Sequence, residues 1–214
     1  MCPASEFSEL VRLMLDNLLV GRYDDCMMNQ STRDLILDCA QALVQTRGFN
    51  AFSYADIAAE LGVKKASIHY HFPSKLDLEL ELLTRYRAGF EAEMKSIEVR
   101  VERSVQRLDQ YASLYIKTLS DNKICLCGMM ASDIGALPNE LKPSLNAFFK
   151  EHIDWLTKVM SAGKSNGELN FTGSAQSQAS SFLAGLQGGL LMANAMRDET
   201  VFKRLKKSLF TQLE

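Results

Sequence analysis

Apolar residues recur along the chain at intervals of three and four positions, which is the spacing of an amphipathic helix. The first well-defined stripe consists of Leu35, Ile36, Cys39, Ala40, Leu43 and Val44. Ser31 or Thr32 is suited to cap the start of this helix, and Gly48 is suited to end it. No segment of the sequence shows the alternation of a half-buried strand. The pattern therefore predicts an all-α protein.

The same periodicity predicts further helices up to the end of the chain. They cover about residues 53–61, 64–70, 74–95, 99–119, 129–137, 138 or 143 to 162, 175–197 and 199–213. Residues 1–28 precede this pattern and allow two interpretations. They form an amphipathic extension of unknown role that docks on the body or on a partner, or they are upstream sequence in front of a natural start at Met27 or Met28.

The segment from Ser53 to Lys75, SYADIAAELGVKKASIHYHFPSK, has the layout of a helix-turn-helix. Ser53 is placed to cap its first helix, with Asp56 at the capping-box position. Ala58 falls where two short helices must cross closely, and Gly62 falls where the first helix must end in the left-handed conformation. The apolar seam between the two helices consists of Ile57, Leu61, Val63 and Ile68.

The charge distribution limits where a nucleic acid could bind. The formal net charge is −2, so a positive field for DNA must be local. No acidic residue occurs between Glu60 and Asp77, whereas five basic or titratable side chains fall there: Lys64, Lys65, His69, His71 and Lys75. A short basic run is commonly a solvated face, but this one coincides with the second helix of the motif, which favours DNA binding.

Cysteine usage and hydropathy exclude several other classes of protein. The five cysteines are odd in number and irregularly spaced, which predicts neither a disulfide framework nor a four-ligand zinc site. His69 and His71 are two positions apart on a helix and point away from each other, so no metal or other cofactor is expected. No apolar run is long enough to span a bilayer and no signal-type cleavage site follows the N-terminal segment, which indicates a cytoplasmic protein. The sequence shows no nucleophile–base set and no phosphate loop, so an enzyme is not expected.

Over residues 31–213 the chain resembles the TetR/AcrR family of bacterial one-component regulators. The resemblance is specific over residues 32–80, where the first helix ends in RGF (47–49) and the motifs IAAELGV and KKASIHYHFPSK follow. Over the C-terminal part it depends on helix number and length. Three positions depart from the usual family pattern: Lys64 replaces a small polar residue, His69 replaces tyrosine and Tyr70 replaces histidine.

The resemblance implies a set of DNA contacts: Ser53, Tyr54, Lys64, Lys65, Ala66, Ser67, His69, Tyr70 and Lys75. The four residues from Lys64 to Ser67 would face base edges or phosphates at the start of the recognition helix. Ser53, Tyr54, Tyr70 and Lys75 would contact phosphates, which set register without reading sequence. His69 occupies the position of a phosphate-binding tyrosine. An alternative role for Tyr70, His71 and Phe72 is to pack the recognition helix onto its neighbours.

The segment 175–195 is rich in small residues, including three glycines within five positions. Each glycine inside a helix costs ~1 kcal/mol relative to alanine, so this density implies close backbone approach. Together with the resemblance, it predicts a homodimer interface formed by Phe182, Gly185, Leu186, Gly189 and Leu190. Packing within one subunit is the alternative.

The resemblance also implies an unknown small-molecule effector in the C-terminal domain, for which Tyr111, Tyr115, Phe149 and Trp155 are candidate contacts. The alternative for these side chains is plain core. Cys125 and Cys127 lie in a predicted break before a short helix and beside Lys123, an environment that favours the reactive thiolate. They are therefore candidate thiol sensors, with two small buried hydrophobes as the alternative.

These observations lead to one expected function and one rival. The expected domains are a helix-turn-helix DNA-binding domain at 29–78 and a helical effector-binding and dimerisation domain at 79–214. The expected function is a homodimeric regulator of transcription that binds a palindromic operator in double-stranded DNA. It would act as a repressor released by a small molecule or by thiol modification. The rival is a helical small-molecule-binding protein whose helix-turn-helix no longer engages DNA.

Overall fold

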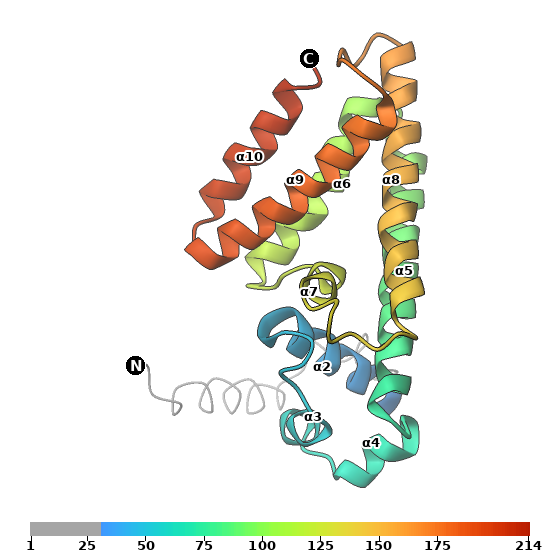
Figure 1. Cartoon of the computed structure of the whole chain (residues 1–214), viewed down its shortest axis with the longest axis vertical. Coiled ribbons are helices and arrows are strands. Elements are labelled where there is room, and N and C mark those ends of the chain that lie inside the picture. Colours follow the sequence, from blue (N-terminus) through green and yellow to red (C-terminus); the bar gives the residue numbers. More distant parts are fainter. Residues whose placement is uncertain (1–30) are drawn as a thin grey trace, which may run out of the picture. The chain divides into compact units, whose positions relative to one another are not determined.

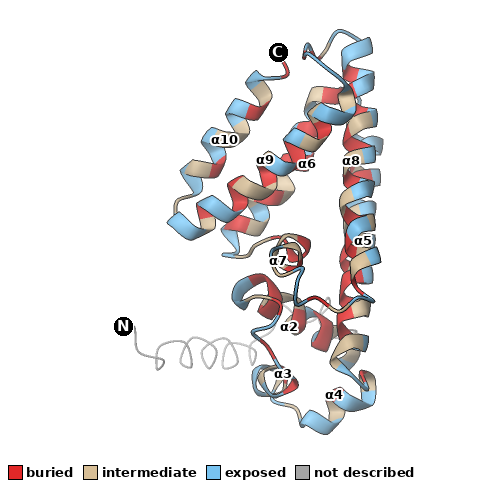
Figure 2. Cartoon of the chain, in the orientation of Figure 1, coloured by how far each residue is buried: buried red, intermediate tan, exposed pale blue. Residues whose placement is uncertain are grey.

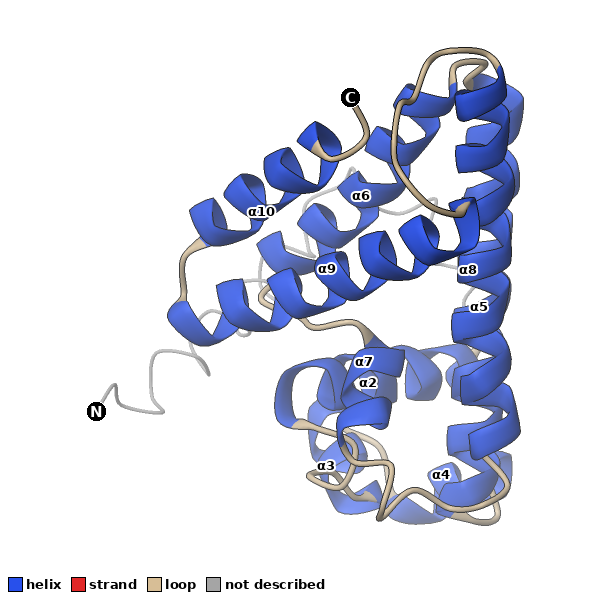
Figure 3. Cartoon of the chain, turned by 45° about the horizontal axis from the view of Figure 1, so that its top comes forward, coloured by secondary structure: helices blue, strands red, loops and turns tan. Residues whose placement is uncertain are grey.

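The computed structural model describes residues 31–214, and this part of the chain forms nine helices and no strand (Figures 1 and 3). The helices are α2 (Thr32–Arg47), α3 (Tyr54–Leu61), α4 (Lys65–His71), α5 (Lys75–Arg100), α6 (Ser104–Ser120), α7 (Leu126–Ser132), α8 (Lys142–Ser165), α9 (Ala175–Met196) and α10 (Glu199–Thr211). The all-α prediction is confirmed. Both interpretations of residues 1–28 concern a segment outside the described residues.

In the N-terminal part of the described residues, the predicted helix ends agree closely with those of the structure. Ser31 precedes α2, and its Oγ accepts a hydrogen bond from the Asp34 amide at 3.2 Å. Gly48 follows α2 with a φ of +105°. The helix that begins after Ser74 continues to Arg100, beyond the predicted end near residue 95.

The short helix α7 differs most from its predicted position. It spans Leu126–Ser132, whereas the sequence pattern placed it at 129–137. The reason is that Leu126, Cys127 and Met130 form a buried face, so the segment taken for a break packs into the core. Cys125 is consequently the N-cap of α7, and Cys127 lies inside the helix.

Helices α2 to α4, which we call the head, pack around the first turns of α5. The side chains they bury include Ile36, Leu43, Phe49, Phe52, Ile57, Ile68, Phe72 and Leu78 (Figure 2). The opposite faces of α3 and α4 are exposed. The apolar seam inferred from the sequence therefore holds the helix-turn-helix against α2 and α5.

Helices α6 to α10, which we call the body, form the larger part of the core. Helix α9 packs against both α8 and α10, and α6 contacts α8, α9 and α10. The long helix α5 starts in the head and packs along α6 and α8 (Figure 1). Helix α5 therefore belongs to both parts and forms a continuous connection between them. Among residues 31–214, no helix combines the length and apolarity that crossing a membrane requires.

Candidate nucleic-acid interface

Local hydrogen bonds fix the start and the end of α3. The Ser53 amide donates to the Asp56 carboxylate at 2.7 Å, and the Asp56 amide donates back to Ser53 Oγ at 3.4 Å. The Ser53 hydroxyl also donates to the Asp56 carboxylate at 2.6 Å, and this bond, followed by the one from the Ser53 amide, holds the pKa of the Asp56 carboxyl below its usual value. Helix α3 ends at Gly62, whose φ of +64° is left-handed. The predicted capping box and glycine turn are both confirmed. Together they fix where α3 begins and ends, and so where the turn into α4 starts.

Helix α4 has one buried and one exposed face. Ile68 and the following Phe72 are 0% and 1% exposed and anchor the helix to the head. Tyr70 is 84% exposed, so its ring does not pack the helix onto its neighbours. Lys64, Lys65, Ala66 and His69 are also exposed, and Ser67 is half-buried. The structure therefore brings most of the expected DNA contacts to one accessible helix.

Tyr54 is placed differently from the expectation that it reaches a phosphate. Its side chain is buried, and its hydroxyl donates to the carbonyl oxygens of Phe72 at 2.9 Å and Ser74 at 2.6 Å. Burial, with smaller contributions from Asp77 and Glu79, raises the pKa of Tyr54 to about 12. Tyr54 thus ties the start of α3 to the turn between α4 and α5, and its hydroxyl is already engaged.

Lys75 and His69 also have partners within the head. The Lys75 ammonium lies 3.5 Å from the Glu79 carboxylate and 4.2 Å from the centre of the Phe52 ring. Burial raises the pKa of the Glu79 carboxyl, and Lys75 opposes this shift. The His69 Nδ1 is 3.3 Å from the Pro73 carbonyl oxygen, with the His69 ring edge-on to Tyr54. Ser53, at the other end, remains exposed although its hydroxyl serves the cap.

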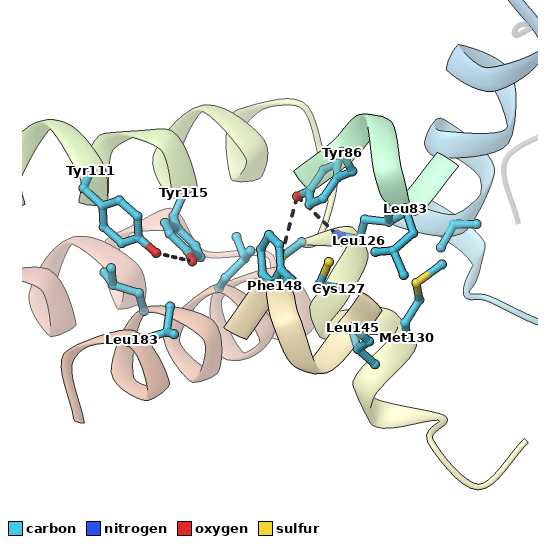
Figure 4. Packing of buried hydrophobic residues seen from close by; sticks show 14 of the residues in the cluster. Leu83, Tyr86, Tyr111, Tyr115, Leu126, Cys127, Met130, Leu145, Phe148 and Leu183 are labelled. Atoms are coloured by element: carbon cyan, nitrogen blue, oxygen red, sulfur yellow. Dashed lines mark hydrogen bonds between the residues drawn. The ribbon is translucent and has the colours of Figure 1, made fainter. Parts of the chain in front are cut away.

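The candidate effector residues are brought together in the core of the body, as Figure 4 shows for Tyr111 and Tyr115. The Tyr111 hydroxyl lies 3.3 Å from that of Tyr115, and its ring stacks on Trp155 at 5.4 Å. All three are buried, whereas Phe149 is half-buried and packs edge-on against Phe148. Tyr111 is therefore in contact with both Tyr115 and Trp155, whereas the ring contact of Phe149 is with Phe148.

The two cysteines do not have the surroundings that the sequence suggested. Cys125 and Cys127 are 2% and 0% exposed, and burial raises the pKa of the Cys127 thiol well above its ordinary value. The Lys123 ammonium lies 3.9 Å from the Asp121 carboxylate. The Cys125 sulfur accepts hydrogen bonds from the Tyr86 hydroxyl at 3.6 Å and from Gln187 Nε2 at 3.3 Å. The thiolate argument is therefore wrong for Cys127, and Cys125 belongs to a buried polar cluster.

Sequence analysis missed three members of this cluster: Tyr86, His152 and Gln187. Gln187 Nε2 also donates to the Tyr115 hydroxyl at 3.3 Å, while its Oε1 has no partner within residues 31–214. His152 Nδ1 lies 2.6 Å from the Tyr111 hydroxyl, and burial lowers the pKa of His152 to about 4. Only the polar character of Gln187 within an apolar helix could have signalled this from the sequence.

The predicted dimer residues face the interior of a single chain. Phe182, Leu186 and Leu190 are at most 1% exposed, and Gly189 is buried. A Cβ on half-buried Gly185 would approach Leu209 of α10 to 2.8 Å. The close approach implied by these glycines is thus to α10 of the same subunit, in agreement with the alternative of packing within one subunit. The five residues do not form an exposed interface.

No group of three or more His, Cys, Asp or Glu side chains within residues 31–214 is placed to hold a metal ion.

Comparisons with known proteins agree with this architecture. A profile described as "Bacterial regulatory proteins, tetR family" matches residues 36–82. A solved TetR-family transcriptional regulator from Agrobacterium tumefaciens is 35% identical over 85% of this chain and 96% of that one, with a TM-score of 0.81. A TetR regulator from Legionella pneumophila is 31% identical over 88% and 100% of the two chains, with a TM-score of 0.80. The reduced form of E. coli NemR, at 20% identity over 86% and 98% and a TM-score of 0.74, shares the fold. A search of curated proteins gave no match.

The chain therefore belongs to the TetR family of transcriptional regulators. It is a DNA-binding regulator of transcription, with a helix-turn-helix head and a helical body, and is not an enzyme.

Proposed function

We propose that the protein is a cytoplasmic homodimeric repressor that binds a palindromic operator through α4 and leaves it when the body binds a small molecule. The observation that carries this proposal is the surface of α4. Lys64, Lys65 and Ala66 are exposed at its first turn, and Tyr70 is exposed further along. A helix that enters the major groove contacts bases with its N-terminal residues.

The division of labour among these residues follows from their chemistry. Lys64 and Lys65 can donate to guanine O6 or N7 or neutralise phosphates, and the Ala66 methyl can contact a thymine methyl. Ser53, Ser67, His69, Tyr70 and Lys75 would contribute polar contacts to the backbone. Tyr54 would act indirectly by holding the α4–α5 turn. The domain boundaries near 29–78 and 79–214 are part of the same proposal.

A different face of α9 is suited to pair two copies of the chain. Ser177, Ser181, Ala184, Gly188 and Leu191 recur at spacings of three and four, and all are exposed except half-buried Gly188. A Cβ on Gly188 would meet no atom within 4 Å. Exposed Met192 and Met196 extend the apolar surface. A stripe of small residues allows two helices to approach closely, and a two-fold axis would make the contact self-complementary.

Release of the operator has two candidate triggers. A small molecule in the body would act by favouring one spacing of the two heads, with α5 as the connecting helix. Modification of the Cys125 thiol is the second route, because a bulky adduct would disrupt its contacts with Tyr86 and Gln187. Titration of operator complexes with N-ethylmaleimide tests this route: release that Cys125→Ser abolishes supports it, and unchanged affinity removes it.

The DNA-binding proposal is tested by fluorescence anisotropy with a palindromic fragment from the protein's own promoter region. We expect saturable binding that weakens steeply as salt rises, because bound lysines displace counterions from DNA. Absence of salt-dependent binding would favour the rival function, a helical small-molecule-binding protein whose head no longer engages DNA.

A further inference from the structure

A groove of about 340 Å³ lies along α5, where this helix meets α2 of the head and α6 of the body. Its volume is at the lower end of the roughly 300–1,000 Å³ of small-molecule sites. Tyr86, Phe90 and Leu114 supply its apolar surface. Tyr86 is buried, and its ring lies 5.1 Å from that of Phe90, so this part of the lining is held in place by packing.

Gly89 lies in the same groove and near the middle of α5. Glycine is, apart from proline, the least favourable residue in a helix interior. Two other helical glycines of the body have a packing explanation: a Cβ on Gly163 would come within 2.6 Å of Leu169, and one on Gly185 within 2.8 Å of Leu209. A Cβ on Gly89 would meet no atom within 4 Å. The missing side chain therefore leaves the α5 backbone open to an occupant from outside the chain.

The polar groups of the groove indicate the charge of that occupant. The Arg85 guanidinium is already paired with the Asp38 carboxylate at 2.7 Å. The ammonium of exposed Lys117 forms no ion pair with another residue of the described part of the chain, and Gln41 adds an amide donor. Glu93 also lines the groove, so an occupant with more than one negative charge would be repelled.

We propose that this groove binds a small amphipathic monoanion, with its apolar part over Tyr86 and Phe90 against Gly89 and its anionic group at Lys117. Because Gln41 belongs to the head and Lys117 to the body, the bound molecule would hold both parts at one spacing. The Tyr86 hydroxyl, which accepts from the Leu126 amide at 3.3 Å, links the groove to the start of α7 (Figure 4). The effect on DNA binding rests on the proposed function, whereas the binding itself does not.

The test uses the full chain and the fluorescent monoanion 1-anilinonaphthalene-8-sulfonate as the probe. We expect saturable binding to the wild type, about ten-fold weaker binding to Lys117→Gln through loss of a charge-assisted contact, and no saturable binding to Gly89→Leu. The matched control is Ala88→Leu, which adds the same side chain at a neighbouring exposed position outside the groove. It should bind like the wild type.

A second variant covers the case in which Gly89→Leu does not fold. Gly89→Ala should raise the melting temperature, because alanine favours the helix, and should also weaken probe binding by partly filling the groove. Equal probe binding by the wild type and both Gly89 variants, or no binding by the wild type, would overturn the proposal. A change of oligomeric state in Gly89→Leu would also overturn it, since a second copy would then occupy the groove.

A parallel operator titration separates this proposal from the function it extends. If the probe binds as expected and shifts operator affinity in the wild type but not in Gly89→Leu, the regulatory role is supported. If it binds without any shift, the regulatory role is refuted and the binding site stands. If the wild type never binds operator, the proposed function fails, but the probe titration still shows whether the groove is a binding site.

Discussion

Gln45 and Ile124 exchange two hydrogen bonds and thereby join the head to the body. The Ile124 amide donates to the Gln45 carbonyl oxygen at 3.1 Å, and Gln45 Nε2 donates to the Ile124 carbonyl oxygen at 3.0 Å. Gln45 is buried near the end of α2, and Ile124 directly precedes the N-cap of α7. The two parts are therefore joined at a second place besides α5, and this place lies next to Cys125.

The side-chain half of this pair should contribute measurably to stability. Gln45→Leu leaves the carbonyl of half-buried Ile124 without its donor, and an acceptor left unpaired away from water costs about 1–3 kcal/mol. We expect a loss of that size in urea unfolding, together with faster hydrogen exchange of the Ile124 amide. Gln106→Leu, at an exposed glutamine of α6, should change neither quantity. Exchange at Ile124 that is unaffected by Gln45→Leu would contradict the role assigned to the pair.

Tyr54 should act on the fold of the head more than on DNA directly. Tyr54→Phe removes the hydroxyl that donates to the Phe72 and Ser74 carbonyl oxygens, so the free energy of unfolding without DNA should fall by about 1–2 kcal/mol. Thermal or urea unfolding measures this. A variant with wild-type stability but reduced operator affinity would instead show that Tyr54 contacts a phosphate.

Substitutions at two neighbouring glycines of α9 should have different effects, one on stability and the other on dimerisation. In Gly189→Ala the new Cβ would collide with the Leu205 side chain, and such overpacking costs about 1–3 kcal/mol of stability. In Gly188→Leu the new Cβ meets no atom of its own chain within 4 Å, but the side chain would block the face that we propose contacts the second copy. Sedimentation equilibrium should therefore show a monomer for Gly188→Leu only. A dimer unaffected by Gly188→Leu would place the interface elsewhere.

Burial of His152 predicts a loss of stability in mild acid. Its pKa is lowered to about 4, so the folded protein keeps the ring neutral while the unfolded chain takes up a proton below pH 6.5. Above pH 6.5 neither the folded nor the unfolded state binds this proton, so the free energy of unfolding keeps its full value. As pH falls from 6.5 to 4 the free energy of unfolding should decrease by up to about 3 kcal/mol. Comparing His152→Gln with the wild type across this range isolates the effect from carboxylate titration. If the stability of His152→Gln and of the wild type changed with pH in parallel, the role assigned to His152 would be contradicted.

The sequence was sufficient for the fold because its signals were local. The Ser53–Asp56 capping box, the left-handed Gly62 and the apolar spacing of α2 depend on neighbours within a few residues. The position of α7 was missed because KICLCGMM lacks a clear helical period, and its burial depends on Tyr86 and Gln187, which lie far away in the sequence.

The candidate site was predictable only where exposure follows from periodicity. Tyr70 is two positions from Ile68 and so lies on the other side of α4, which is why the helical spacing that buries Ile68 exposes Tyr70. The burial of Tyr54 could not be foreseen, because it depends on carbonyl groups exposed by the α4–α5 turn. The glycines of α9 indicated close packing correctly, but sequence alone does not distinguish α10 from a second subunit as the partner.

The central claim, that α4 binds DNA through its first turn, is tested most directly by the salt dependence of operator binding in Lys65→Ala. Loss of one phosphate-neutralising lysine should lower affinity and reduce the slope of log K against log salt by about 1 per protomer. If Lys65 contacts a base instead, affinity should fall with relaxed sequence preference. Lys158→Ala, at an exposed lysine of α8, should match the wild type. Identical affinity, slope and sequence preference in Lys65→Ala and the wild type would contradict the account.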